Sequence, residues 1–232
     1  MPNRWIPLTL LSLAAIGLTA ALISISVGEN TVENYRVEEA GEVQELIAGI
    51  RQLGDRLGPE DADVSIEVFN DIQIPEGSAY MAEVVDPLIE KYVRPGDANM
   101  ILRHYPLGPK PVTLGGIAAE AAGMQDRQWQ FAELYTRNLD LAPEQGVTET
   151  FLNEIAAVVP KLDVTQWEED RNSQEAEDLA AEDEKIAAEN HFTAAPVIVV
   201  TGPSATEVLD PRPSLDRLEA RARVEAAIEE AR

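Results

Sequence analysis

The order in which strand-like and helix-like patterns follow one another restricts the fold of this chain more than any other feature. Residues 64–69, Val-Ser-Ile-Glu-Val-Phe, alternate along their length and are rich in β-branched residues, which favours a strand. Residues 79–93 carry apolar side chains at helical spacing, and residues 99–105 indicate a second strand. A helix that joins two strands favours a parallel pair with a right-handed crossover.

The second part of the pattern is helical first and then returns to strands. Between residues 113 and 190 the apolar residues keep a helical period, and residues 196–201 and 205–209 then indicate a strand and its hairpin partner. Ser214 is placed to begin a closing helix over residues 214–231. This order predicts an α/β domain, a thioredoxin-like fold with an inserted helical domain over about 113–190.

The charge of the chain excludes one class of partner. Acidic residues outnumber basic ones 42 to 18, a formal net charge of −24, so phosphate backbones are repelled and we expect no nucleic-acid binding. Part of this charge lies on the helix expected over residues 174–190. There Leu179, Ile186 and Ala187 share one side, and the acidic residues on the other side are expected to face solvent.

Cysteine is absent from the sequence, and histidine is scarce. The absence of cysteine excludes disulfides, thiol nucleophiles, cysteine-type zinc sites and iron–sulfur ligation. His104 and His191 are the only histidines, too few for a multi-histidine metal site, and we interpret both as structural or surface residues. The sequence therefore predicts neither a metal nor a cofactor.

An uncharged segment near the start of the sequence predicts a membrane anchor. No residue between Arg4 and Glu29 is charged, and at about 1.5 Å per residue Trp5–Gly28 is long enough to cross a bilayer of about 30 Å. A cleaved signal peptide is the alternative, with an apolar core of about 7–15 residues. Because the apolar run continues to Val27, we expect a retained transmembrane helix over residues 5–28.

Charge also sets the expected orientation. Arg4 precedes the span and several glutamates follow it, so the positive-inside rule predicts a single-pass membrane protein with a cytoplasmic N-terminus. Residues 1–4 then form a short cytoplasmic tail and residues 29–60 a neck. Residues 61–232 form the folded domain, on the periplasmic or extracellular side of the membrane.

Small residues recur within the predicted span at a spacing of three and four. They are Ala14, Gly17, Ala21, Ser24 and Gly28. Such a face lets another transmembrane helix approach closely, which favours a helix-packing role. A span rich in alanine and serine also produces such stripes by chance, so both interpretations stay open.

Several short phrases resemble the DsbA-like thioredoxin-fold proteins, especially their membrane-anchored bacterial relatives. Phe69–Gly77 resembles the family phrase F-x-D-x-Q-C-P-x-C, and Arg103–Leu107 resembles R-x-F-P-L. Ala118–Gly123 followed by Gln128–Phe131 is similar to the A-A-x-A-A-G and F-W-x-F signature of the inserted helical domain. Ala195-Pro196 stands where the family has threonine and a cis-proline. The resemblance implies this fold for the chain and a cis peptide at Pro196.

The family's catalytic motif is changed in this sequence. Its two cysteines fall on Ile74 and Gly77, so the degenerate site reads Ile74, Pro75, Glu76, Gly77. Thiol–disulfide exchange needs an activated thiolate, so the resemblance carries the fold but not the activity. Asp71 and Glu76 lack the further stabiliser that a hydrolytic pair needs. We therefore expect a pseudoenzyme with no catalytic residue.

Two functions of different class remain for such a chain. In the first, the protein is an accessory or structural subunit of an integral membrane complex, contacted through its span and its exported domain. In the second, it is an exported peptide-binding or chaperone-like module, with a peptide ligand in the groove beside Ala195 and Pro196. The acidic surface fits a basic docking partner and equally fits adaptation to salt.

Overall fold

The computed structural model describes residues 36–106, 114–142, 147–210 and 216–232, and all of them belong to one compact unit. The predicted span with its small-residue face lies outside the described residues, as does Ser214. Among the described helices, none combines the length and apolarity that a membrane crossing requires.

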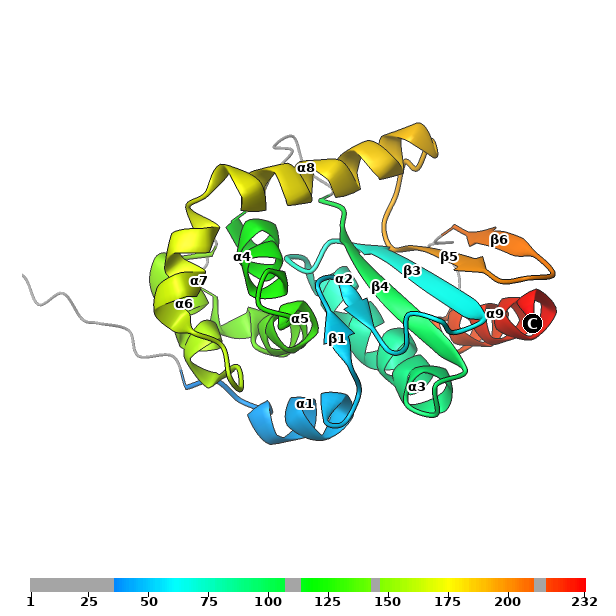
Figure 1. Ribbon diagram of the computed structural model, residues 1–232, viewed down its shortest axis with the longest axis horizontal. Helices are drawn as coiled ribbons and strands as arrows, with labels where there is room; N and C mark the ends of the chain where they lie inside the picture. The colour runs from blue at the N-terminus through cyan, green and yellow to red at the C-terminus, as the bar shows by residue number, and fades with distance from the viewer. Residues whose placement is uncertain (1–35, 107–113, 143–146, 211–215) are drawn as a thin grey trace, which may run out of the picture. The chain divides into compact units, whose positions relative to one another are not determined.

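A six-stranded sheet forms the centre of the domain (Figure 1). Its strands, in the spatial order β1-β2-β4-β3-β5-β6, are β1 (Gln52–Leu53), β2 (Arg56–Leu57), β4 (Ala98–His104), β3 (Val64–Asn70), β5 (Val197–Thr201) and β6 (Thr206–Leu209). β3 and β4 pair in parallel from Val64 opposite Ala98 to Asn70 opposite His104, and the other neighbours are antiparallel. The predicted strands and their parallel pairing are therefore confirmed.

The connection between β3 and β4 is one long helix with two widened turns. It comprises α2 (Pro75–Tyr80), the π-helical turn η1 (Met81–Val85), α3 (Asp86–Leu88) and the π-helical turn η2 (Ile89–Val93). Pro87 lies within this helix, where it lacks an N–H and its ring crowds the preceding turn. A widened turn is one of the ways in which a helix accommodates such a residue.

Most of the segment expected as a neck over residues 29–60 is packed onto the domain. Within its described part, α1 (Ala40–Ile47) buries Val43, Leu46 and Ile47 in the core, and β1 and β2 extend the sheet. The Arg94 guanidinium donates to the carbonyl oxygens of residues 45, 46 and 48 and so caps the end of α1. From residue 36 on, this segment therefore belongs to the folded domain.

The inserted helical domain lies where the sequence predicts it, between β4 and β5. Its elements are α4 (Leu114–Gly123), α5 (Gln128–Arg137), the 3-10 turn η3 (Leu139–Leu141), α6 (Glu149–Val158), α7 (Val164–Arg171) and α8 (Gln174–Glu189). Trp129 and Trp167 are fully buried, and their indole N–H groups donate to the carbonyl oxygens of Asp55 and Ala118. Trp129 therefore joins the insertion to the β1–β2 hairpin, and Trp167 joins α7 to α4 within the insertion.

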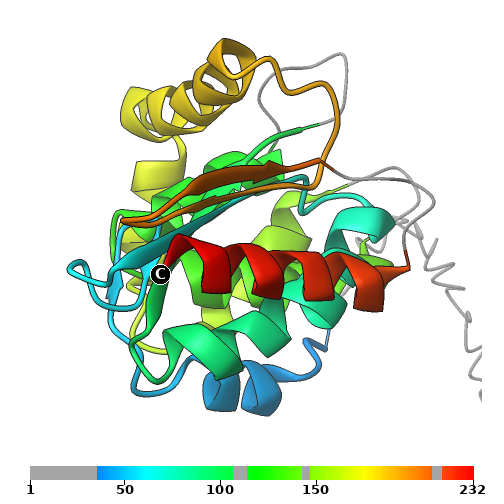
Figure 2. The same cartoon turned by 90° about the vertical axis from the view of Figure 1, so that its right-hand side faces the viewer.

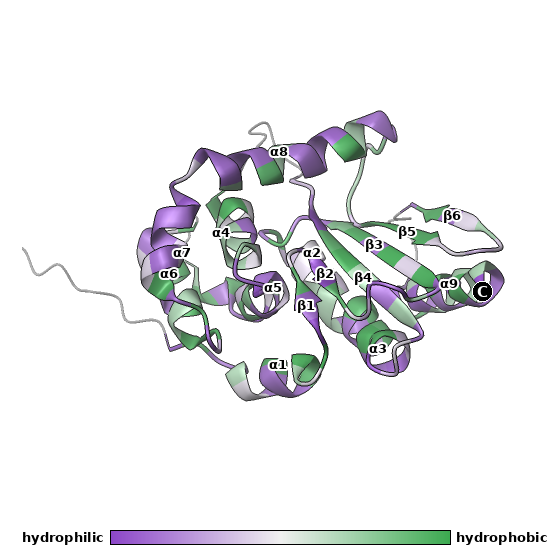
Figure 3. Ribbon diagram, viewed as in Figure 1, coloured by the Kyte–Doolittle hydropathy of each residue, from purple (hydrophilic) through white to green (hydrophobic). Residues whose placement is uncertain are grey.

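Helix α8 departs from the expected packing at Leu179, whereas Ala187 is buried as expected and Ile186 packs, partly buried, against a cluster of apolar side chains. Leu179 is 41% exposed, and the buried positions are Ala176, Ala180, Asp183 and Ala187. Figure 3 shows the remaining surface of α8 as largely hydrophilic. The small alanine side chains let α8 approach α4 and β4 closely, which a leucine on that face would prevent.

Asp183 ties α8 to the end of β4. One of its carboxylate oxygens accepts the backbone N–H of His104 at 2.8 Å, and the other accepts from Arg103 at 3.1 Å. Arg103 also ion-pairs with Asp55 at 2.8 Å and with Glu67 at 3.1 Å. The arginine of the R-x-F-P-L phrase thus joins the hairpin, the sheet and the insertion.

The sheet is covered by helices on both faces. α9 (Arg217–Ala231) lies beside the Pro75–Val93 helix on one face, and α8 lies over the other (Figure 2). α9 is capped by Asp216, whose carboxylate accepts the Leu218 N–H at 2.6 Å. The closing helix is therefore present, and Asp216 provides its cap within the described residues.

Candidate functional site

The position of the family motif is the loop between β3 and α2. Asp71 is buried, and its Oδ1 accepts the Gln73 N–H at 3.0 Å, which shapes the turn. Ile74 is extended, with φ −116° and ψ 148°, and Pro75 follows as the first helical residue. Ile74 is half-buried and Glu76 is exposed. The backbone therefore begins a helix here without any group that could attack a disulfide.

Gly77 occupies the place of the family's second cysteine, and it is packed against the loop. A Cβ added there would lie 2.8 Å from Asn70 Oδ1 and still closer to the carbonyl oxygen of Asp71. Asn70 also donates from Nδ2 to the Gly77 carbonyl at 3.1 Å. The loop is thus closed around a glycine, and no side chain of any kind fits at position 77 in this backbone.

The peptide bond between Ala195 and Pro196 is cis, the isomer expected from the resemblance. Pro196 is buried and Ala195 is half-buried immediately before β5. The position that the family uses beside its thiols therefore keeps its place in this fold, although both thiols are missing.

A buried polar cluster lies beneath the loop. Gln73 Oε1 accepts the Gly115 N–H at 3.0 Å, and a Cβ on Gly116 would overlap the His104 imidazole. Burial lowers the pKa of His104 to about 4, against the opposing charge of Asp71. Burial likewise raises the pKa of Tyr135. His104 is thus held neutral at physiological pH, in keeping with a structural residue, whereas His191 is exposed.

A pocket of about 420 Å³ opens beside the first turns of α2. Its lining residues come from α2, η1, α5, η3 and the segment before α1: Pro75, Ser78, Ala79, Ala82, Glu133, Thr136, Arg137, Leu139, Asp140 and Glu39. One wall is apolar and the floor carries charge. The pocket therefore lies between the thioredoxin core and the helical insertion, next to the degenerate motif.

Glu133 is the unusual member of this lining. Its side chain is fully buried, and within the described structure neither carboxyl oxygen has a hydrogen-bond donor from another group. Arg137 Nε is 3.5 Å away, while the same guanidinium pairs with Glu39 at 2.6 Å and with Asp86. Burial and the nearby Asp86 carboxyl raise the pKa of Glu133 well above its usual range. Burial also raises the pKa of Asp86, to about 6.

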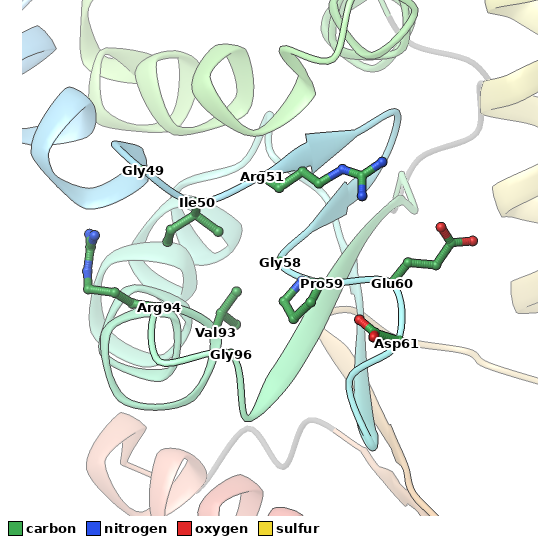
Figure 4. A pocket seen from close by; sticks show the side chains of 10 residues that line it. All are labelled: Gly49, Ile50, Arg51, Gly58, Pro59, Glu60, Asp61, Val93, Arg94 and Gly96. Atoms are coloured by element: carbon green, nitrogen blue, oxygen red, sulfur yellow. The ribbon is translucent and has the colours of Figure 1, made fainter.

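A second pocket, of about 500 Å³, lies at the opposite end of the sheet (Figure 4). It is formed at the ends of α1, β2 and η2, by residues 49–51, 58–61, 93–94 and 96. Ligands of open α/β sheets bind at the carboxyl ends of the strands, whereas this pocket lies at the amino ends of β3 and β4. Arg94, which lines it, is occupied in capping α1. We therefore interpret the residues that line this pocket as structural and not as a ligand-binding site.

No group of three or more histidine, aspartate or glutamate side chains in the described ranges has an arrangement that could hold a metal ion. Of the two acidic residues near the motif, Asp71 is buried and Glu76 is exposed.

The fold and the loop define a class of protein. Residues 54–218 match the thioredoxin family, so the chain belongs to it, and its helical insertion and motif positions place it with the DsbA-like thioredoxin-fold proteins. Ile-Pro-Glu-Gly stands in place of C-x-x-C, in a chain without cysteine.

Two curated relatives are similar to this chain over most of their own length. The probable disulfide bond formation protein D of Bacillus anthracis is 26% identical over 201 residues, covering 85% of this chain and 92% of that protein. The protein of the same name from Bacillus cereus is 29% identical over 157 residues, covering 66% of this chain and 73% of that protein.

Solved structures show the same fold. Oxidised BdbD from Bacillus subtilis aligns with a TM-score of 0.60 at 17% identity, covering 78% of this chain and 97% of that one. The α-DsbA1 protein from Wolbachia pipientis aligns with a TM-score of 0.59 at 16% identity, covering 76% of this chain and 89% of that one. At this level of identity the likeness concerns the fold.

Sequence reasoning missed the residues of the pocket. Glu133 and Arg137 are four residues apart, a spacing that places them on one helical face, and Glu133 also follows Trp129 by four residues. The sequence signal for this site was an acidic residue on the same helical face as a tryptophan of the core. Asp86 and Glu39 carry no such signal, because only the folded chain brings them to Arg137.

Proposed function

We propose that this protein is a redox-inactive thioredoxin-fold subunit that is anchored in a membrane and serves an integral membrane complex of the respiratory, photosynthetic or transport kind. The packing around Gly77 carries the proposal. A site that had only lost its thiols would keep room for them, whereas this loop is rebuilt around a glycine. The position is therefore used for packing, and the protein acts through its surfaces.

Location supports the same conclusion. The curated relatives are named for disulfide bond formation, a process of oxidising compartments outside the cytoplasm. The predicted span and its charge distribution would put residues 36–232 in such a compartment and hold them at the membrane. An exported domain held at a membrane and lacking thiols is suited to docking on a neighbouring membrane protein.

The loop before β5 favours a second candidate function. Ala195 is half-buried there, at the position beside which the family holds an extended peptide, and a peptide could pair with this backbone as an added strand. Ile74 offers a half-buried apolar side chain at the position of the family's reactive thiol. The protein would then bind exported client chains without oxidising them.

Mild detergent solubilisation followed by affinity purification of the full chain separates the two functions. Stoichiometric recovery of one integral membrane complex supports the subunit role. Recovery of many exported proteins in small amounts supports client binding and contradicts the subunit role. Recovery of the protein alone contradicts both.

The packing of Gly77 has its own test. Gly77→Ala is expected to destabilise the domain by more than about 3 kcal/mol, because overpacking against backbone atoms has no flexible neighbour to move. Gly41→Ala in α1 is the matched control, since a Cβ there has nothing within 4 Å. It should be neutral or stabilising by up to about 1 kcal/mol. Urea unfolding of both variants measures the difference, and equal stability would show that position 77 still has room.

A further inference from the structure

The pocket beside α2 offers several hydrogen-bond acceptors, and the buried donor of its described lining that makes no hydrogen bond is Arg137 Nε, on the floor. The Ser78 hydroxyl donates to the Thr136 carbonyl at 2.6 Å, and the Thr136 hydroxyl donates to the Glu133 carbonyl at 3.1 Å. Each hydroxyl has a single proton, so both oxygens keep only lone pairs for a ligand. The Glu133 carboxyl adds a third acceptor on the floor, and among the described residues it faces Arg137 Nε, at 3.5 Å, and the Asp86 carboxyl.

The charged groups around Glu133 come from five segments. They are Arg137 on α5, Asp86 on α3, Glu90 on η2, Glu39 before α1 and Asp140 on η3. The wall formed by Pro75, Ser78 and Ala79 of α2 and Ala82 of η1 carries no titratable side chain. Arg137 is the only cation among these described groups. Its two terminal nitrogens pair with Glu39 and Asp86, and its Nε lies 3.5 Å from Glu133. Without a bound cation, the close carboxyls of Asp86 and Glu133 can share one proton.

We propose that this pocket binds the ammonium group of a lysine side chain presented by a partner protein. An ammonium has three N–H donors, which match the carboxyl of Glu133 and the hydroxyl oxygens of Ser78 and Thr136. The apolar wall of Ala79, Ala82 and Leu139 suits the methylene stem of the same side chain. Binding would release the proton that the carboxyl pair holds and replace it with the ligand's charge.

The chemistry of the floor selects lysine over arginine. A guanidinium binds best to a carboxylate that is open along both oxygens, as a planar fork. Glu133 already has Arg137 on one side, at 3.5 Å, and Asp86 close by, which leaves space for a compact point charge. The net charge of −24 would also draw a basic partner surface toward this face.

The inference rests on the proposed docking function for the source of the lysine, and its experiment tests the pocket alone. The full chain in detergent is titrated with Nα-acetyl-lysine methylamide, and the neutral Nα,Nε-diacetyl compound serves as the matched ligand. At pH 7.5 the charged probe should bind at least about tenfold more tightly. Because one proton is displaced, affinity should fall by up to about tenfold per pH unit as the pH is lowered below the pKa of the pair.

Glu133→Gln keeps the size of the side chain and removes its charge, so it should weaken binding of the charged probe at least about tenfold and abolish the pH dependence. Glu219→Gln removes an equal charge from an exposed position on α9 and should leave binding unchanged. Equal affinity for the two probes, or unchanged binding by Glu133→Gln, overturns the inference. If that variant does not fold, the carboxyl signal of Glu133 in a 13C-labelled wild-type chain decides: the charged probe must lower its pKa. Failure here together with recovery of a membrane complex would reject the pocket and keep the docking function.

Discussion

Two arginines of this domain each face three carboxylates, and both join the thioredoxin core to the helical insertion. The first is Arg103 with Asp55, Glu67 and Asp183, and the second is Arg137 with Glu39, Asp86 and Glu133. Their compositions are nearly identical. Their surroundings differ in one respect, the supply of hydrogen-bond donors.

At the first cluster the buried carboxylate has donors for both of its oxygens. Asp183 receives the His104 backbone N–H and the Arg103 guanidinium, even though burial raises its pKa to about 7. At the second cluster, the nearest guanidinium nitrogen to the equally buried Glu133 is Arg137 Nε at 3.5 Å, longer than a normal hydrogen bond. The same set of residue types is thus a structural tie in one place and an incompletely satisfied pocket floor in the other. A carboxylate cluster becomes a candidate site only when its acceptors exceed its donors.

Between the two clusters, the larger effect is expected at the structural tie, the Arg103 cluster. Asp183→Ala should destabilise the domain by about 3 kcal/mol, because the His104 N–H and the Arg103 charge are both left buried without that partner. Glu182→Ala is the control, since its neighbouring carboxylate is exposed and pairs only with Lys185 among the described residues, and it should cost less than about 0.5 kcal/mol. Urea denaturation measures both. Similar costs for the two variants would mean that Asp183 does not tie α8 to β4.

A smaller effect concerns the pH dependence that the second cluster causes. The folded pKa of Asp86 is about 6 and that of Glu133 is also raised, so the folded state holds a proton that the unfolded chain has lost above about pH 4.5. Stability from this pair is therefore present at low pH and is lost as pH rises through the folded pKa values. Between pH 5 and pH 8 the loss should be about 1–3 kcal/mol.

Glu133→Gln isolates that contribution. With the Glu133 carboxyl removed, its own raised pKa no longer contributes, so the decline in stability with rising pH should be smaller than that of the wild type, while the part due to Asp86, whose pKa burial raises, should remain. Asp183 contributes a decline of the same sign to both proteins and cancels in the comparison. Thermal unfolding at a series of pH values measures the two slopes, and parallel slopes would contradict the shared proton.

The smallest effect is expected at the rim of the second cluster. Glu39 is half exposed, so Glu39→Gln should cost less than about 1 kcal/mol in spite of its 2.6 Å contact with Arg137. That cost should disappear in 1 M salt, where charges are screened within about 3 Å. A loss that persists in high salt would show that Glu39 contributes through packing.

Hydrophobic period and turn residues were enough to predict the core of this fold. The strands at 64–69 and 196–201 are rich in β-branched residues, and the match to the family's phrases indicates which strand of the family's fold each one corresponds to. The two-residue strands β1 and β2 were not predictable, because such short segments have no period and exist only by pairing with β4. The neck predicted from the sequence, residues 29–60, therefore includes residues that belong to the folded domain.

The face of α8 and the pocket show a different limit. Hydropathy favoured Leu179 as a core residue, but the close approach of α8 to α4 places alanine side chains at the contact instead. Asp183 is buried there because the His104 backbone N–H donates a hydrogen bond to its carboxylate. Gly77 was visible as a lost cysteine, yet the collision of any side chain with Asp71 depends on the folded loop. Pairings between distant segments, such as Glu39 with Arg137, have no local signal.

The apolar interior runs without interruption from the sheet into the insertion. Val68 of β3, Leu88 of α3, Phe131 of α5 and Trp167 of α7 belong to one cluster of buried side chains. Neither part can open without exposing the surface of the other, so amide protons in β3 and α5 should exchange with deuterium at the same free energy of opening. Truncation of the insertion would then remove a wall of the core, and the remaining strands would not persist as a separate thioredoxin unit.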